Sequence, residues 1–421
     1  MPPSNHCVSP SLLGANRLSG LGKLAFACLW LMVFAIPWQN ALVISSVGTI
    51  ARLIGLMAGV VCILAIIERA RISFPTVGHV LMTLFVLWTT ATCLWSFNPD
   101  QTVVAAVSWF QLLVMVWLIR EIAPRDPEQR RLMQAYVLGT YVSGADTLYR
   151  YFFRLQFEPT DRYVSKGFNA NDLAIVMALS IPLSYYLATE SKGLMVLVYR
   201  LQLVLVGTTI LLTASRGGLL ASLVALAVVP WTFARLTRFQ KTAIVLTVAA
   251  LVCSGLFFVP ATSWERLSTI SKEFTRGTLG DRPMIWQAGW DVFRVHPFRG
   301  VGAGAFRDAH TLTVAWVAHN TFLSILVEEG VIGFGLFFAL MVFLAVCALE
   351  MPPLEQKLWI ITLGTWAVGA SSGSWELGKP TWFLFGLLMA RWADVARGRR
   401  TGSRASHFCA HRLRLLPESR P

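Results

Sequence analysis

Uncharged apolar runs of about twenty residues recur along this chain of 421 residues. One of them, Val331 to Leu349, holds nineteen residues without a charge, which is enough to cross a bilayer as a helix at about 1.5 Å per residue. A bilayer core offers the backbone no water, so such runs must satisfy their own hydrogen bonds as helices. Only 14% of the residues are charged, against about 25% in an ordinary soluble domain. The sequence therefore predicts an all-α polytopic membrane protein.

We expect one integral membrane domain over residues 1–421, with about twelve transmembrane helices. The expected spans are 24–44, 47–67, 77–95, 102–119, 132–149, 172–189, 194–213, 217–234, 241–261, 331–349, 357–374 and 380–396. The first run follows two basic residues, as in a signal sequence, but lacks a small-x-small cleavage site. We therefore interpret it as a retained helix.

Basic residues divide the loops into two sets. The first set carries Arg69, Arg71, Arg120, Arg125, Arg130, Arg131, Lys192, Arg235, Arg238, Lys241 and Lys357. The positive-inside rule places these loops, the basic tail 397–421 and both termini in the cytoplasm. The other loops then face outward, and the longest of them are about 150–171 and 262–330.

The outward loops also carry cations, against the usual insertion bias. These are Arg150, Arg154, Arg162, Lys166, Arg216, Arg266, Lys272, Arg276, Arg282, Arg294, Arg299 and Arg307. Few carboxylates accompany them, and arginine suits phosphate oxygens, so we expect an anionic ligand there. Arg216 lies in the tight turn TASRGG, where the simpler alternative is a side chain that reaches from a helix end to the membrane surface.

Other patterns indicate no further chemistry. The net charge of +14 is explained by this distribution over the loops, so no nucleic-acid partner is expected. The seven cysteines are scattered, without a CxxC, and predict neither a disulfide framework nor a zinc site. The glycine-rich run GVGAG at 300–304 lies outside any βαβ unit. It therefore indicates a tight turn with close backbone approach, and no nucleotide loop.

Polar residues stand directly before one apolar span, in the sequence HNTFLSILVEEG from His319 to Gly330. Asn320 is a suitable N-cap, and the positions after it predict a short interfacial helix, Thr321 to Glu329. Gly330 suits the left-handed position after a helix. Such a segment would hold His319 at the outer edge of the membrane, although a lone histidine there is more often structural.

The whole pattern His319-Asn320, nine residues, Gly330, two residues, Gly333 resembles the H-[NSQ]-x9-G-x-x-G signature of bacterial O-antigen ligases and related polymerases. TASRGGLLASL at 213–223, DRPMIWQAGWDVFRVHPFRGVGAGAF at 281–306 and GFNANDLA at 167–174 are similar to other motifs of that family. The resemblance covers roughly residues 165–350. It implies a GT-C-like membrane glycosyltransferase whose major periplasmic loop, 262–330, contains short interfacial helices and carries the catalytic motif.

The resemblance also implies a reaction at the periplasmic face of the bacterial inner membrane. A glycan would pass from an undecaprenyl-diphosphate-linked donor to a sugar hydroxyl of lipid A–core, with inversion. His319 would be the general base, since an imidazole with a pKa of about 6.5 is mostly neutral at pH 7. Arg216 and Arg282 match the family's functional arginines and would bind the diphosphate. The remaining candidate substrate-binding residues are Asn320, Arg162, Lys166, Asn169, Asn171 and Arg299.

No cofactor or divalent cation is expected, because the outer loops contain no DxD-like pair and Asp281 and Asp308 are isolated. The sequence does not determine the oligomeric state, and a monomer is compatible with it. Within the family, a polymerase and a protein O-oligosaccharyltransferase stay open as alternatives. A polymerase can show R-x10-G patterns in two outer loops, and only Arg266 to Gly277 matches here. From another class, a lipid or polysaccharide transporter would place polar groups at mid-membrane, whereas these spans are nearly free of charge.

Overall fold

The computed structural model describes residues 19–44, 48–155, 162–277, 280–310, 312 and 317–414. Its first half contains α1 (Gly20–Ala35), η2 (Ile36–Trp38), β1 (Val43–Ile44), β2 (Gly48–Thr49), α2 (Ile50–Arg69), α3 (Val77–Ala91), η3 (Thr92–Leu94), α4 (Pro99–Ile122), α5 (Asp126–Phe152), α6 (Ala170–Glu190) and α7 (Leu194–Leu212). Its second half contains α8 (Arg216–Leu226), α9 (Val228–Thr232), η4 (Phe233–Arg235), α10 (Arg238–Phe258), α11 (Ala261–Ser268), α12 (Ile270–Arg276), α13 (Arg282–Val295), α14 (Phe306–Ala309), α15 (Thr321–Leu349), α16 (Pro353–Ala370) and α17 (Lys379–Arg414).

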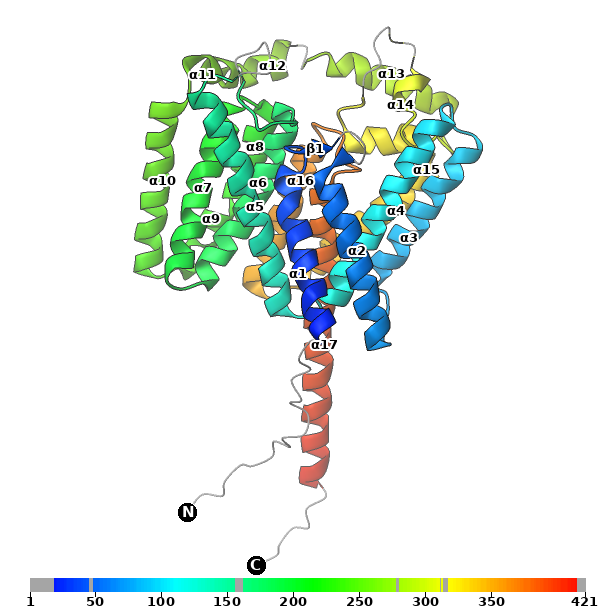
Figure 1. Ribbon diagram of the computed structural model, residues 1–421, viewed down its shortest axis with the longest axis vertical. Coiled ribbons are helices and arrows are strands. Elements are labelled where there is room, and N and C mark those ends of the chain that lie inside the picture. Colours follow the sequence, from blue (N-terminus) through cyan, green and yellow to red (C-terminus); the bar gives the residue numbers. More distant parts are fainter. Residues whose placement is uncertain are drawn as a thin grey trace, which may run out of the picture.

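The long helices run side by side in one bundle, and α11 to α14 lie across one end of it (Figure 1). We call this end the site end. The loops with the two sets of basic residues lie at opposite ends, because successive long helices alternate in direction. The helix α17 projects from the other end and continues past the expected limit of its span at 396, as far as Arg414.

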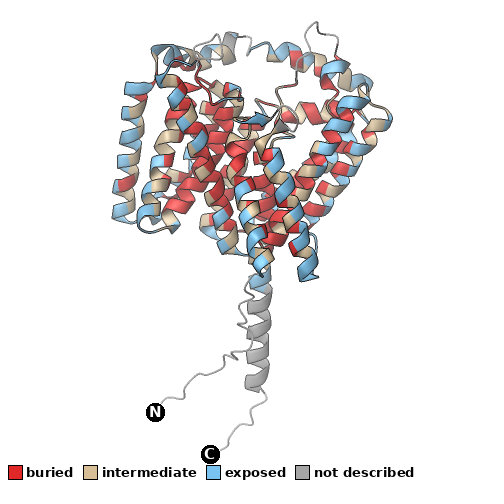
Figure 2. Cartoon of the chain, in the orientation of Figure 1, coloured by how far each residue is buried: buried red, intermediate tan, exposed pale blue. Residues whose placement is uncertain are grey.

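The helices differ sharply in burial (Figure 2). Almost all of α6 is buried, whereas α10 at the edge of the bundle is mostly exposed although it is apolar. A soluble protein would expose so much apolar surface only at a binding site. On a helix long enough to cross a bilayer, such a face is what contact with lipid requires. The bundle is therefore that of a polytopic membrane protein.

Nine helices of the described part of the chain are long and apolar enough to cross a membrane. The three other expected spans correspond to α5, α16 and α17, which have more polar sequences and pack against the nine. Their lengths suffice at about 1.5 Å per residue. The total of twelve spans and the GT-C-like fold remain predictions.

The predicted end of the first span, at residue 44, is wrong, and the second span, predicted at 47–67, is shifted by two or three residues. The first helix gives way to the 3₁₀ turn Ile36–Trp38, which contains a proline, and the chain then forms a hairpin in which Val43 pairs with Thr49. The second helix begins only at Ile50. Hydropathy cannot separate a short apolar strand from the end of an apolar helix, so the prediction continued the helix through the strand.

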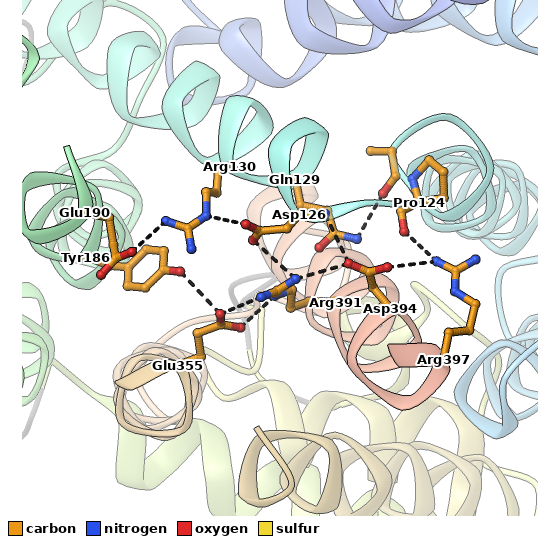
Figure 3. Close-up of polar contacts among 11 residues, drawn as sticks. Pro124, Asp126, Gln129, Arg130, Tyr186, Glu190, Glu355, Arg391, Asp394 and Arg397 are labelled. Carbon is orange, nitrogen blue, oxygen red and sulfur yellow. Dashed lines mark hydrogen bonds and ion pairs between the residues drawn. The ribbon is translucent and has the colours of Figure 1, made fainter. Parts of the chain in front are cut away.

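An ion-pair network holds the end of the bundle opposite the site end (Figure 3). Arg391 of α17 contacts Glu355 of α16 at 2.6 Å and both Asp126 of α5 and Asp394 at 3.2 Å. Arg130 bridges Asp126 at 2.8 Å and the last residue of α6 at 3.1 Å. Part of the basic charge expected at this end is therefore paired, and it joins four helices.

Candidate active site

His319 is held in an unusual backbone conformation immediately before α15. Its φ is +47°, in the left-handed region that side chains other than glycine rarely occupy. The next residue, Asn320, caps the helix as predicted, because its Oδ1 accepts the N–H groups of Phe322 and Leu323 at 3.0 and 3.1 Å. The cap and the turn before it therefore fix the position of the His319 backbone and the direction in which its side chain starts.

The kink at Gly330 separates the first turns of α15 from its long apolar part. The predicted positive φ is confirmed at +67°, but ψ is −171° and so the residue is not in the left-handed helical conformation. The reason is a neighbouring loop: a Cβ on Gly330 would lie 2.3 Å from the carbonyl oxygen of Phe298, and the N–H of Val331 donates to the carbonyl of Pro297 at 2.8 Å. The kink is thus shaped by the loop that precedes GVGAG.

The GVGAG run forms the tight, closely packed turn that the sequence predicts. Gly300 has a φ of +67°, and a Cβ there would lie 2.3 Å from the carbonyl oxygen of Glu328. That carbonyl accepts the N–H of Gly302 at 2.8 Å, while the Glu328 carboxylate accepts the N–H of Gly304 at 2.7 Å. The loop therefore positions α15 and does not offer an open phosphate cradle.

The segment between α16 and α17 connects the start of α15 to the start of α8. The carbonyl of Gly373 accepts the Thr321 hydroxyl at 3.0 Å, two residues after His319. On the other side, a Cβ on Gly217 would lie 2.8 Å from Oγ of Ser372. The dipeptide at 372–373 thus packs between the turn that carries the predicted base and the turn that carries Arg216.

Arg216 is already bound to the outer segment. Its guanidinium contacts the Glu273 carboxylate at 3.0 Å and the Thr269 hydroxyl at 2.7 Å, and it donates to the carbonyl of Arg266 at 3.2 Å. Arg150 and Arg294 also have acidic neighbours, Asp146 and Asp291. The expectation that few carboxylates accompany the outer cations is therefore wrong for these three. Arg150 and Arg294 pair with carboxylates one turn away in their own helices, whereas the partner of Arg216 comes from a distant segment.

Arg282 begins α13 and has a different environment. Its guanidinium makes no hydrogen bond or ion pair within the described part of the chain, and burial lowers its pKa. Farther along α13, Trp286 donates from Nε1 to the carbonyl of Ala318 at 3.0 Å and so joins this helix to the residue before His319. The pKa of His319 is lowered by burial and then by the charges of Arg282 and Arg307. The imidazole is consequently neutral at pH 7 and has cations nearby.

A polar cavity of about 430 Å³ is lined by Val317 and Ala318, the two residues before His319, but not by His319 itself. Its wall includes Ala318, Arg307, Ser324, Glu328 and Glu376. The Ser324 hydroxyl donates to Glu376 at 2.9 Å, and burial raises the pKa of Glu376 to about 7. Its Oε2 has no hydrogen-bond partner in the described chain. The sequence left the role of Glu376 open, because only its nearness in space to Ser324 places it in the wall of the cavity.

Two further candidates, Arg162 and Asn171, support the turn before Arg216. The Arg162 guanidinium donates to the carbonyl of Thr213 at 2.8 Å and to Oδ1 of Asn171 at 3.1 Å. The same oxygen accepts the hydroxyl of Ser215, the N-cap of α8, at 2.8 Å. These contacts place both residues next to Arg216.

The other predicted site residues are more dispersed. Asn169 caps α6 by accepting the N–H of Asp172 at 2.8 Å, and Lys166 is an exposed residue nearby. Arg299 lies on the α3–α4 side of the site end, with its guanidinium 5.6 Å from the ring centre of Trp95. The structure therefore does not group Arg299 with the candidates at α6 and α8.

The chain is similar to a known protein family over part of its length. Residues 201–338 match the family model described as O-antigen ligase. The matched segment runs from α7 into α15 and contains Arg216, Arg282 and His319. No curated protein matches the chain. Over these residues, which build much of the site end, the chain is similar to the O-antigen ligase family.

Proposed function

We propose that this protein is an O-antigen ligase. It transfers a glycan from undecaprenyl diphosphate to a sugar hydroxyl of lipid A–core at the periplasmic face of the bacterial inner membrane, which completes lipopolysaccharide. The proposal is supported by His319 and Arg282, which both lie in the matched segment. The charge of Arg282 helps to lower the pKa of His319, and the residue before His319 lines the polar cavity. The site end is then the periplasmic end of the bundle.

In this proposal His319 is the general base. A sugar hydroxyl is a weak nucleophile, and a neutral imidazole can take its proton as the oxygen attacks. The new bond forms at the anomeric carbon of the donor while the bond from that carbon to the diphosphate breaks. The electron pair leaves with the diphosphate, and direct displacement inverts the anomeric centre.

The arginines stabilise the leaving group. Arg282 lacks a protein partner in the described chain, so its guanidinium is available for a diphosphate oxygen without the loss of an existing ion pair. Arg216 has Glu273 as a partner, and an incoming diphosphate would compete with that carboxylate. A charge-assisted contact that strengthens as negative charge builds on the leaving oxygen lowers the barrier to transfer.

The polar cavity takes the acceptor sugar. Its mixture of carboxylate, hydroxyl and guanidinium groups can both donate to and accept from sugar hydroxyls. The Glu376 carboxyl, with a pKa of about 7, can do either according to pH. This carboxyl accepts a hydrogen bond from Ser324, which lies in the first turn of α15, directly after the proposed base.

The test is transfer by purified protein with both lipid substrates after His319→Ala. We expect transfer to be abolished while the protein stays folded and inserted. His296→Gln is the matched control, because that histidine also lies in the outer segment but packs against Phe97. Wild-type transfer by His319→Ala would rule out the base role.

The same preparation tests metal dependence, and a deletion strain tests the alternative polymerase. We expect transfer in excess EDTA, and strict dependence on added magnesium or manganese would contradict the metal-free mechanism. In a deletion strain, loss of all glycan attachment indicates a ligase, whereas single-repeat caps on lipid A–core indicate a polymerase. Loss of attachment with the lipid-linked glycan retained on the cytoplasmic side of the membrane would instead indicate a transporter.

A further inference from the structure

A second cavity, of about 480 Å³, opens between α1, α2 and α4. Most of its wall is apolar, and it contains no acidic residue among the described residues that line it. It follows the length of α2 from Thr49 and Arg52 at the site end to Ile63, more than two turns farther into the bundle. Its shape is therefore that of a groove along a membrane helix.

Glycines keep this groove open. Gly55 and Gly59 both line it from α2. A Cβ on Gly59 would meet nothing within 4 Å, and one on Gly55 would touch only the Met32 side chain, at 3.7 Å. These glycines therefore leave unfilled space, although glycine costs a helix roughly 1 kcal/mol relative to alanine.

Two cations stand at the site end of the groove. Arg52 of α2 makes no hydrogen bond or ion pair with the described chain, and Lys379 of α17 bonds only the neutral Gln39 side chain, at 2.6 Å. Both residues line the same cavity, where two like charges repel each other. Cations that lack a carboxylate and face the same space form a complementary site for an anion.

The groove lies next to the candidate active site. Leu377 lines both the groove and the polar cavity that contains Glu376. On the other side of this contact, α4 contributes Ala105 to the polar cavity and Ser108 to the groove, one turn away. A ligand in the groove would therefore have its head beside the cavity where sugars are expected.

We propose that this groove binds a membrane lipid with a phosphate head, the phosphate between Arg52 and Lys379 and one hydrocarbon chain along α2. An apolar channel alone would accept any chain, so the cations select the anionic head. The binding site stands on these contacts and does not depend on the proposed transferase activity.

The test uses the full chain in phosphatidylcholine nanodiscs that contain a small fraction of phosphatidic acid with a photoactivatable acyl chain. We expect cross-links to peptides from α2 and α4. The double substitution Arg52→Gln and Lys379→Gln should lower them about tenfold or more, since each charge-assisted contact is worth about a factor of ten. Gly59→Leu should also remove them, because the added side chain fills the groove.

Three controls are matched to these tests: a glycine substitution outside the groove, a lipid probe with a zwitterionic head, and free inorganic phosphate. Gly335→Leu places the same side chain on a helical glycine of α15 with nothing within 4 Å, outside the groove, and should leave the cross-links unchanged. A phosphatidylcholine probe that cross-links as strongly as the phosphatidic acid probe would overturn the proposal. Unchanged cross-linking in the double variant, or in Gly59→Leu, would also overturn it. Displacement by millimolar inorganic phosphate would also overturn it, by indicating a site for free phosphate.

Discussion

His319 combines a strained backbone with a depressed pKa, and the two properties fit one task. A residue other than glycine in the left-handed region costs roughly 1–2 kcal/mol, and the Asn320 cap and the Trp286 contact maintain it. Burial and the charges of Arg282 and Arg307 disfavour the imidazolium. The proposed base is thereby both oriented and unprotonated at neutral pH.

The pH profile of transfer should reflect these charges. Since the pKa of His319 lies below its usual value of about 6.5, protonation of this histidine should not lower kcat/KM near pH 7. It should fall about tenfold per pH unit only below that lowered pKa, where the imidazole is protonated. Arg307→Gln removes a nearby positive charge, so the acid limb should move to higher pH.

Arg294→Gln is the control for that shift, because Arg294 is exposed on α13 and pairs with Asp291 at 3.7 Å. An acid limb that is the same in wild type, Arg307→Gln and Arg294→Gln would show that His319 does not control it.

Lysine should not replace Arg282. If its guanidinium grips diphosphate with paired N–H groups, lysine offers a charge without the planar fork. Loss of one charge-assisted contact costs on the order of 1.5–3 kcal/mol, or roughly 10- to 150-fold. Most of the loss should appear in kcat, because the contact strengthens in the transition state.

The measurement is the rate of transfer by Arg282→Lys and Arg294→Lys, normalised to protein in the membrane. Near-wild-type rates for both variants would mean that Arg282 supplies only positive charge and makes no specific contact with the diphosphate.

The kinked helix α15 is the element that joins the site to the membrane. Its first turns carry Thr321, Ser324 and Glu328 toward the polar cavity and the 371–379 segment, and its long apolar part packs in the bundle. The kink is possible because a glycine in each of two segments lets the backbones pack closely. Gly330 packs against the backbone of Phe298, and Gly300 packs against the backbone of Glu328. These two contacts set the height of His319 relative to the spans.

Gly330→Ala should therefore damage both stability and activity. A Cβ there would lie 2.3 Å from a carbonyl oxygen, and the combination of φ +67° with ψ −171° is open essentially only to glycine. We expect a loss of at least about 1–3 kcal/mol from backbone strain, seen as a lower unfolding temperature in detergent. Gly335→Ala is the control, since that helical glycine faces open space and alanine favours helix by roughly 1 kcal/mol. Equal unfolding temperatures would contradict the account of the kink.

The molecule as a whole has two unlike ends. The site end carries α11 to α14, the hairpin and the 371–379 segment, while the other end is held by the Arg391 network. The proposed reaction requires the site end to be periplasmic, where both lipid-linked substrates would be presented. It therefore makes a prediction about topology.

Cysteines introduced at two exposed positions test this orientation. Arg294→Cys on α13 should react with an impermeant maleimide in intact cells whose outer membrane has been permeabilised. Arg238→Cys at the start of α10 should react only after lysis. The unsubstituted protein gives the background from native cysteines. Reversed labelling would contradict the topology and the proposed reaction together.

The sequence by itself determined the features that depend on neighbouring residues. Uncharged runs predicted membrane helices, Asn320 predicted a cap, and the glycines at 300–304 predicted a close turn, because each follows from local hydrogen bonding and burial. Only the tertiary structure decided which distant segments meet. It brought Glu376 to the cavity wall, paired Arg216 with Glu273, and placed Lys379 beside Arg52. Hydropathy records how apolar each helix is and not which helix lies beside it, so contacts between helices far apart in the chain had no signal in the sequence pattern.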